Sequence, residues 1–236
     1  MINTIPLTNL LLAFVPVLFT IVILYKWSLG SKRALYAVFR MLIQLFTIGY
    51  CLTYIFESDT PLYVLIILLV MIVSSSWIAL GSLKHNKKKL LKQAIISITI
   101  GGGFTLLIIT QLVLNIQPWY KAQTMIPLAG MIFANCMNSI SLASERFFAE
   151  NDRGTAYIES RNTAFKASLI PVTNSLFAVG LVSIPGMMTG QILSGISPLI
   201  ATRYQIVVMC MVFGSAGISA ALFLIMCKSK SVSNKG

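Results

Sequence analysis

Long apolar runs alternate with short polar segments along the whole chain. Seven of the runs are long enough to cross a bilayer as helices, at about 20 residues a crossing. They cover approximately residues 7–25, 34–56, 62–83, 94–116, 125–144, 169–193 and 204–227. Backbone groups in hydrocarbon must hydrogen-bond within their own segment. The pattern therefore predicts an all-α, polytopic membrane protein with seven transmembrane helices in a single transmembrane domain, residues 1–236.

Composition supports a membrane location. Of the 236 residues 57% are hydrophobic and only 10% are charged, and the mean hydropathy is +0.86. A soluble globule of this size needs more polar surface than this chain can supply. The four cysteines lie in or beside apolar runs without C-x-x-C spacing, so they indicate neither a disulfide framework nor a zinc site.

The net charge of +12 is a topological signal. If the N-terminus is outside and the C-terminus inside, 16 of the 18 Lys and Arg residues fall on the inner side, and only Lys121 and Arg203 remain outside. The basic residues are scattered at the ends of apolar runs and do not line one face with aromatics, so nucleic acid is not an expected partner. The lipid bilayer is an expected partner. The chain is expected to be a multi-pass membrane protein.

Nothing in the chain is expected to hydrolyse ATP or to catalyse a reaction. Gly101-Gly102-Gly103 is followed by Phe104-Thr105, without the lysine of a phosphate-binding loop. The triple glycine is better explained as a close-packing patch between helices. There is no H-E-x-x-H pair, and the single histidine, His85, lies in a lysine-rich loop. We expect no enzyme activity and no cofactor bound by this chain.

Amides occur within several of the apolar runs. Met131, Asn135, Asn138 and Leu142 follow one another at helical spacing and share a helix face. Amides in hydrocarbon either hydrogen-bond across helices or line a wet cavity, so this face is either a helix contact or the lining of a polar pathway. Gln44 in the second run has the same two interpretations.

The run 169–193 contains helix-breaking residues. Pro185-Gly186 interrupts the hydrogen-bond ladder at membrane depth, which predicts a hinge or a cavity lining. Asn174 precedes this break. Met187 and Met188 follow it, and their thioether sulfurs suit either a transition metal at a constriction or ordinary apolar packing.

The segment 145–168 is expected to form a cytoplasmic elbow between the fifth and sixth crossings. Unlike the basic loops elsewhere, it balances acids against bases and adds apolar side chains. Such a segment either lies flat on the membrane or docks into a groove of another protein, and we favour docking. Gly154 is the expected turn. The residues expected to make the docking contact are Phe147, Phe148, Glu150, Asp152, Gly154, Tyr157 and Ile158.

Two segments carry a resemblance to a known family. MIPLAGMI at 125–132 and VGLVSIPGMMTGQILSGISP at 179–198 resemble the signature segments of FetB-type permeases, the membrane subunits of bacterial iron-export ABC transporters. Plant aluminium-tolerance permeases are similar. RMLIQLFTIGY at 40–50 and Trp77 fit more loosely. In this chain ENDRGTAYIES replaces the longer elbow of the family, with its leucine-glycine-alanine-threonine turn.

The resemblance implies a permease of the bacterial cell membrane that exports metal ions such as iron and contributes to metal homeostasis. It implies a separate ATP-binding cassette subunit, ATP bound by that partner, and a homodimer of permeases. On this basis we expect the polar pathway to use Gln44, Met131, Asn135, Asn138, Asn174, Met187 and Met188. Pro185 and Gly186 would form the hinge, and the elbow would couple to the ATPase.

The alternative is a stand-alone secondary carrier or channel without an ATPase partner. Such a carrier would most simply use an ionisable residue at membrane depth. None of the six acids lies near the middle of an apolar run, which favours the ABC hypothesis. The residues alone do not exclude a purely structural membrane scaffold.

Overall fold

The computed structural model describes residues 6–57, 60–81, 83 and 87–231, so the prediction for His85 lies outside the described part. Contacts within the chain divide it into unit 1, residues 1–58, and unit 2, residues 59–236. Where the chain is described, it forms helices, with one isolated bridge between Val179 and Ser183 and no strand. Six of the helices are long and apolar enough to cross a membrane. The prediction of an all-α, polytopic membrane protein is confirmed.

Unit 1 is a pair of antiparallel helical segments. The first consists of α1 (Leu7–Leu12) and α2 (Val15–Lys26), and the second is α3 (Ser31–Glu57). The expected single helix over 7–25 is interrupted at residues 13–14, because Pro16 in the first turn of α2 has no N–H to continue the ladder. Gly30, at φ +77°, closes the turn before α3.

No described residue of unit 1 is buried within the chain. Large apolar side chains stand exposed on α2 and α3, such as Phe19 at 68% and Phe46 at 65% of their surface. Lipid or protein must therefore cover this surface.

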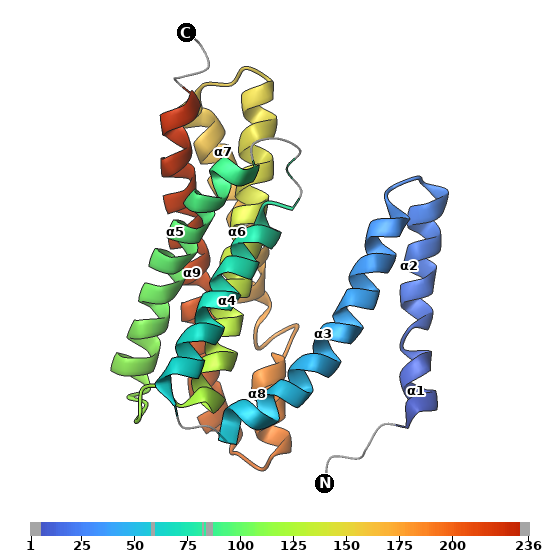
Figure 1. The fold of residues 1–236 in the computed structure, drawn as a ribbon, viewed down its shortest axis with the longest axis vertical. Helices are drawn as coiled ribbons and strands as arrows, with labels where there is room; N and C mark the ends of the chain where they lie inside the picture. The colour runs from blue at the N-terminus through green and yellow to red at the C-terminus, as the bar shows by residue number, and fades with distance from the viewer. Residues whose placement is uncertain (1–5, 58–59, 82, 84–86, 232–236) are drawn as a thin grey trace. The chain divides into compact units, whose positions relative to one another are not determined.

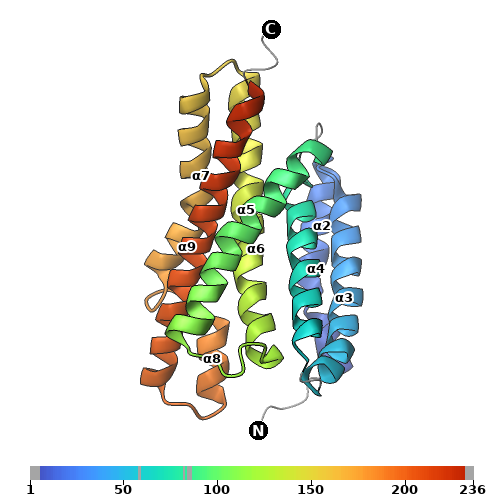
Figure 2. The ribbon, with the colours of Figure 1, turned by 60° about the vertical axis from the view of Figure 1, so that its left-hand side comes forward.

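Unit 2 is a helical bundle (Figures 1 and 2). Its members are α4 (Pro61–Ala79), α5 (Lys87–Leu107), the π-helix η1 (Ile108–Val113), α6 (Ala122–Asp152), α7 (Tyr157–Ala178), α8 (Gly186–Leu193) and α9 (Pro198–Ser231). The central helix is α6, which contacts α4, α5, α7 and α9. Its buried face includes Ile132, Cys136 and Ile140, none of which exposes any surface.

Two members of the triple glycine allow the close approach of helices that the sequence predicts. A Cβ on Gly101 would lie 2.8 Å from the backbone nitrogen of Ser219 and closer still to its hydroxyl, so α5 and α9 touch there. A Cβ on Gly102 would lie 2.9 Å from the ring of Phe133 on α6. Ser219 donates to the sulfur of Cys136 at 3.1 Å, which links α9 to α6 at the same level. Gly103 differs, because a Cβ there would meet nothing within 4 Å.

The apolar run 169–193 does not form one helix. Helix α7 ends at Ala178 and α8 begins at Gly186, and residues 179–185 between them are not helical. Gly180, at φ +82°, turns the chain, and its N–H donates to the Ser183 carbonyl at 3.0 Å. The prediction of a break near Pro185-Gly186 is confirmed, but the break begins at Val179, six residues before Pro185.

The segment 145–168, expected to form an elbow between two crossings, is largely helical. Helix α6 continues to Asp152 instead of ending near Ser144, and α7 begins at Tyr157. The first charged residues therefore mark where the chain becomes polar and not where the helix ends. The Arg146–Glu150 ion pair, one turn apart, supports this continuation. Only residues 153–156 form the turn, with Gly154 at φ +83°, so the prediction that Gly154 makes the turn is confirmed.

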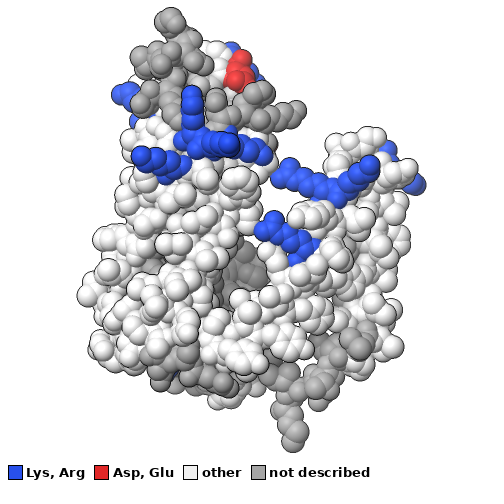
Figure 3. Space-filling view, viewed as in Figure 1, with Lys and Arg blue, Asp and Glu red and all other residues white. Residues whose placement is uncertain are grey.

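Basic residues gather at one end of unit 2, where α5 begins, α6 and α7 meet and α9 ends (Figure 3). Lys121 and Arg203 lie at the opposite end, just before α6 and in the first turns of α9. Within unit 1, Lys26, Lys32 and Arg33 lie at the turn between α2 and α3. In each unit, basic residues therefore concentrate at one end, and this is the asymmetry from which the orientation in the membrane was predicted.

Candidate functional site: the turn between α6 and α7

A buried carboxylate organises the turn between α6 and α7. Glu150, at the end of α6, exposes 9% of its surface. Its Oε1 lies 2.5 Å from a guanidinium nitrogen of Arg146 and 3.4 Å from one of Arg153. Its Oε2 accepts a hydrogen bond from the Thr155 hydroxyl at 3.4 Å, and the Thr155 N–H donates to the Glu150 carbonyl at 3.2 Å. One carboxylate therefore holds both sides of the turn.

Aromatic rings tie the base of the turn to α9. The ring of Tyr157 lies edge-on to that of Phe147, with centroids 6.0 Å apart, and the Tyr157 hydroxyl donates to the Leu224 carbonyl on α9 at 3.1 Å. The cationic groups of Arg161 and Lys228 each lie 5.9 Å from the Tyr157 ring centroid. Burial raises the pKa of the Tyr157 phenol, while the nearby Arg161 charge acts in the opposite direction.

The seven residues expected to contact a partner divide into two groups. Phe147 and Glu150 are buried, and Phe148 and Tyr157 are half-buried. Asp152, Gly154 and Ile158 are exposed, Ile158 by 63%. The first group supports the turn from within, and only the second is fully available to another molecule.

The residues expected to line a pathway lie on several helices. Asn135 and Met131 are half-buried on α6, and the Asn135 amide nitrogen donates to the Met131 carbonyl at 2.8 Å within the same helix. Asn138 on α6 and Asn174 on α7 are exposed, as is Gln44 on α3 of unit 1. Met187 and Met188 are half-buried on α8, immediately after the predicted hinge. Pro185 precedes the first residue of α8, which is Gly186.

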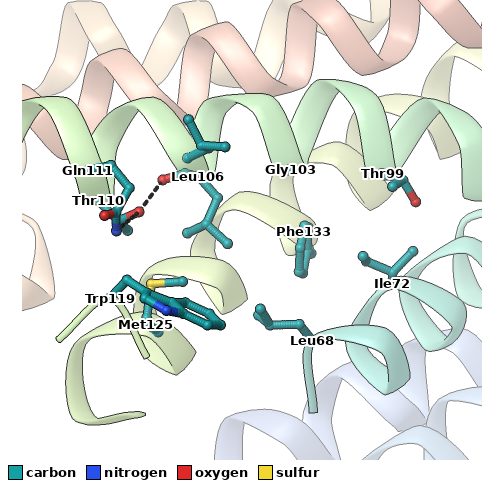
Figure 4. A pocket seen from close by; sticks show the side chains of 11 residues that line it. Leu68, Ile72, Thr99, Gly103, Leu106, Thr110, Gln111, Trp119, Met125 and Phe133 are labelled. Carbon is teal, nitrogen blue, oxygen red and sulfur yellow. Dashed lines mark hydrogen bonds between the residues drawn. The ribbon is translucent and has the colours of Figure 1, made fainter. Parts of the chain in front are cut away.

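A cavity of about 400 Å³ lies among α4, α5, η1 and α6 (Figure 4). Its walls are mostly apolar, with Leu68 and Ile72 from α4, Leu106 from α5 and Phe133 from α6. Gln111 on η1 contributes an amide group to the lining of the cavity. The sequence contained a signal for this residue, because Gln111 is an amide in an apolar run just as Gln44 is, but sequence reasoning passed over it.

The described residues include no group of three or more His, Cys, Asp or Glu side chains that could hold a metal ion.

Comparison with known proteins places the chain among membrane proteins. The model of the family described as Uncharacterised protein family (UPF0014) matches residues 7–161 and 151–231. The two matched segments overlap at the turn between α6 and α7, where the sequence predicts a departure from the family. No solved structure matches the chain.

Curated relatives cover most of the chain. It is 37% identical over 199 residues to UPF0014 membrane protein slr1647 of Synechocystis, which is 77% of this chain and 76% of that protein. It is 33% identical over 230 residues to "Probable iron export permease protein FetB" of Escherichia coli, 91% and 87% of the two chains. Protein ALUMINUM SENSITIVE 3 of Arabidopsis thaliana is 29% identical over 231 residues, which cover 91% of this chain and 83% of that protein.

Proposed function

Because the chain belongs to the Uncharacterised protein family (UPF0014) and is a multi-pass membrane protein related to permeases, we propose that it is the membrane subunit of an ABC transporter. The complex exports metal ions such as iron across the bacterial cell membrane. A separate subunit binds and hydrolyses ATP, and this chain binds no cofactor of its own. The iron export named for the Escherichia coli relative supports the choice of cargo.

The observation that carries the proposal is the construction of the turn between α6 and α7. Its tip is exposed at Asp152, Gly154 and Ile158, while its base is fixed by Glu150 and by the bond between Tyr157 and Leu224. A rigid, exposed turn at the end of two long helices passes displacement on to those helices instead of absorbing it. This is the property required of a contact with an ATP-driven subunit.

Movement of the turn would reach three helices together. Helices α6, α7 and α9 contact one another, and Tyr157 joins the start of α7 to the end of α9. The non-helical segment 179–185, ending at Pro185-Gly186, separates α7 from α8. Binding of ATP by the partner would then shift the bundle between inward- and outward-facing states, with this segment as the hinge.

We propose seven crossings with the N-terminus outside and the C-terminus inside. Six crossings are the long apolar helices, and the sixth in chain order is the broken one made by the end of α7, residues 179–185 and α8. A broken helix is tolerated at membrane depth where protein or water satisfies its free backbone groups. With this count, the basic end of unit 2 and the turn between α6 and α7 face the cytosol.

The pathway would lie between two copies of the chain. Asn138 and Asn174 are exposed in a single copy, and amides facing lipid are costly. A homodimer that covers the amide-bearing faces of α6 and α7 would remove this cost and enclose a polar route. Met187 and Met188 would lie at its constriction.

The experiment is co-purification of the tagged full chain with an ATP-binding cassette subunit expressed in the same cells. The exchange Ile158→Asp places a charge on the exposed apolar side chain of the tip, so we expect the ATPase to be lost from the complex. The control is Gln123→Glu, an exposed position in the first turn of α6 at the opposite end of unit 2. Undiminished ATPase binding by Ile158→Asp, or uphill efflux by the purified chain alone, would refute the proposal.

A further inference from the structure

The cavity among α4, α5, η1 and α6 has no role in the proposed transport cycle. Its volume of about 400 Å³ lies within the range of small-molecule sites, about 300–1,000 Å³. No Asp, Glu, His or Lys lines it, so its chemistry does not suit a metal ion. It suits an apolar or amphiphilic molecule.

The amide and the indole that line the cavity lie toward one end. Figure 4 shows Thr110, Gln111 and Trp119 there, and Ile72 and the Thr99 hydroxyl toward the other end. The Thr110 hydroxyl donates to the Leu106 carbonyl at 2.8 Å and accepts from the Gln111 amide nitrogen at 3.4 Å. This bond uses only the nitrogen of the Gln111 amide, so the amide oxygen can accept a hydrogen bond from a ligand.

The polar end lies at the end of the membrane-crossing segments. Trp119 belongs to the connection between the candidate crossings Lys87–Val113 and Ala122–Asp152, and tryptophan is favoured at membrane interfaces. Leu68 and Ile72 lie further inside the crossing Pro61–Ala79. From interface to bilayer interior, the cavity lining thus changes from amide and indole groups to aliphatic side chains with a single hydroxyl, that of Thr99.

The side chains next to the lining on α4 and α5 are exposed and apolar. Leu69 on α4 is 63% exposed, and Phe104 and Leu107 on α5 are 57% and 58% exposed. In a membrane the surroundings of such a surface are acyl chains. We propose that an acyl chain of a phospholipid occupies this cavity, with its ester group at the end formed by Gln111 and Trp119.

Fluorescence quenching tests the proposal without any ATPase. Trp27→Phe and Trp77→Phe in the full chain leave Trp119 as the single tryptophan. The protein is purified in detergent, and phosphatidylcholine brominated on its acyl chains is added in increasing amounts. We expect saturable quenching of Trp119 at a low ratio of lipid to protein.

Glycine variants give a matched comparison. Gly103 lines the cavity, and a Cβ there meets nothing within 4 Å, so Gly103→Leu places a side chain in the space of the acyl chain. Gly214 on α9 is equally open but lies outside the lining. We expect Gly103→Leu to remove at least half of the saturable quenching and Gly214→Leu to leave it unchanged. Equal quenching in the two variants would overturn the proposal.

A further variant keeps the test decisive if Gly103→Leu fails to fold, which size-exclusion chromatography would reveal. Gln111→Leu removes the amide but keeps the volume, and we expect it to raise the concentration of brominated lipid needed for half-maximal quenching severalfold. No change in that concentration would contradict the role of Gln111. Absence of saturable quenching in the parent protein would overturn the proposal.

Discussion

The contact between Gly101 and Ser219 yields a prediction about the packing of α5 on α9. Replacing Gly101 by alanine adds one methyl group where the Ser219 backbone nitrogen would lie 2.8 Å and its Cα 3.1 Å away. A backbone atom cannot rotate out of the way as a side chain does. The two helices must therefore separate locally, and neighbouring contacts such as the bond from Ser219 to Cys136 must lengthen.

The magnitude follows from two opposing effects. Overpacking of a well-filled contact costs about 1–3 kcal/mol, while replacing glycine by alanine within a helix gains about 1 kcal/mol of helix propensity. Gly103→Ala, two residues along the same helix, gains the propensity without the collision, because nothing lies within 4 Å of its Cβ. The difference between the two variants therefore isolates the overpacking.

The assay is thermal unfolding of the purified full chain in detergent, followed by the loss of the monodisperse peak in size-exclusion chromatography. At roughly 2–4 °C per kcal/mol for a domain of this size, Gly101→Ala should unfold several degrees below Gly103→Ala. Equal unfolding temperatures for the two variants would refute the conclusion that α5 and α9 are in backbone contact at this level.

Three further predictions concern the turn and the pathway. Tyr157→Phe removes the hydrogen bond to Leu224 and should lower the free energy of unfolding by about 0.5–1.5 kcal/mol. Because burial raises the Tyr157 pKa, the wild-type protein should also lose stability as the pH rises through that pKa, above the ordinary value of 10.0, and the variant should lack this component. Glu150→Gln frees Arg153, so trypsin should cleave after this residue faster. Asn138→Leu should reduce metal efflux from cells to background at normal protein levels.

Each of these predictions has a matched control on an exposed residue of the same type. Tyr63→Phe should leave unchanged both the free energy of unfolding and its dependence on alkaline pH. Glu145→Gln should not alter the rate of trypsin cleavage after Arg153. Asn162→Leu should show normal metal efflux. An alkaline transition shared by Tyr157→Phe and the wild type would contradict the pKa argument. Unchanged cleavage in Glu150→Gln would show that the carboxylate does not hold the turn. Normal efflux by Asn138→Leu would remove this residue from the pathway.

The apolar runs predicted the helices well where length and hydropathy decide the outcome. The crossings near residues 34–56, 62–83 and 204–227 all contain long helices. Boundaries were predicted less well, because charge shows where the chain becomes polar while hydrogen bonding shows where the helix ends. Helix α6 therefore extends eight residues beyond Ser144 to Asp152, and α4 ends at Ala79, before the expected position 83.

Chemistry was harder to predict than topology. The sequence predicted a docking segment between residues 147 and 158, but the separation of buried Glu150 from exposed Ile158 depends on which way each faces in the tertiary structure. The cavity at Gln111 also escaped prediction, because it requires α4, α5 and α6 to come together and a π-helical turn to follow α5. No local pattern encodes such a meeting of distant segments.

Under the proposed function, the rigid turn between α6 and α7 would also limit which ATPases the chain can use. Helix α6 has 31 residues, so at 1.5 Å each it measures about 46 Å, some 16 Å more than the hydrocarbon core of a bilayer, about 30 Å. Removing one residue from its end shortens its reach by about 1.5 Å and rotates the tip by about 100°. A relative with a longer turn would therefore present its tip at another height and in another direction, and exchange of ATPase subunits between the two should fail even where every contacting side chain is the same.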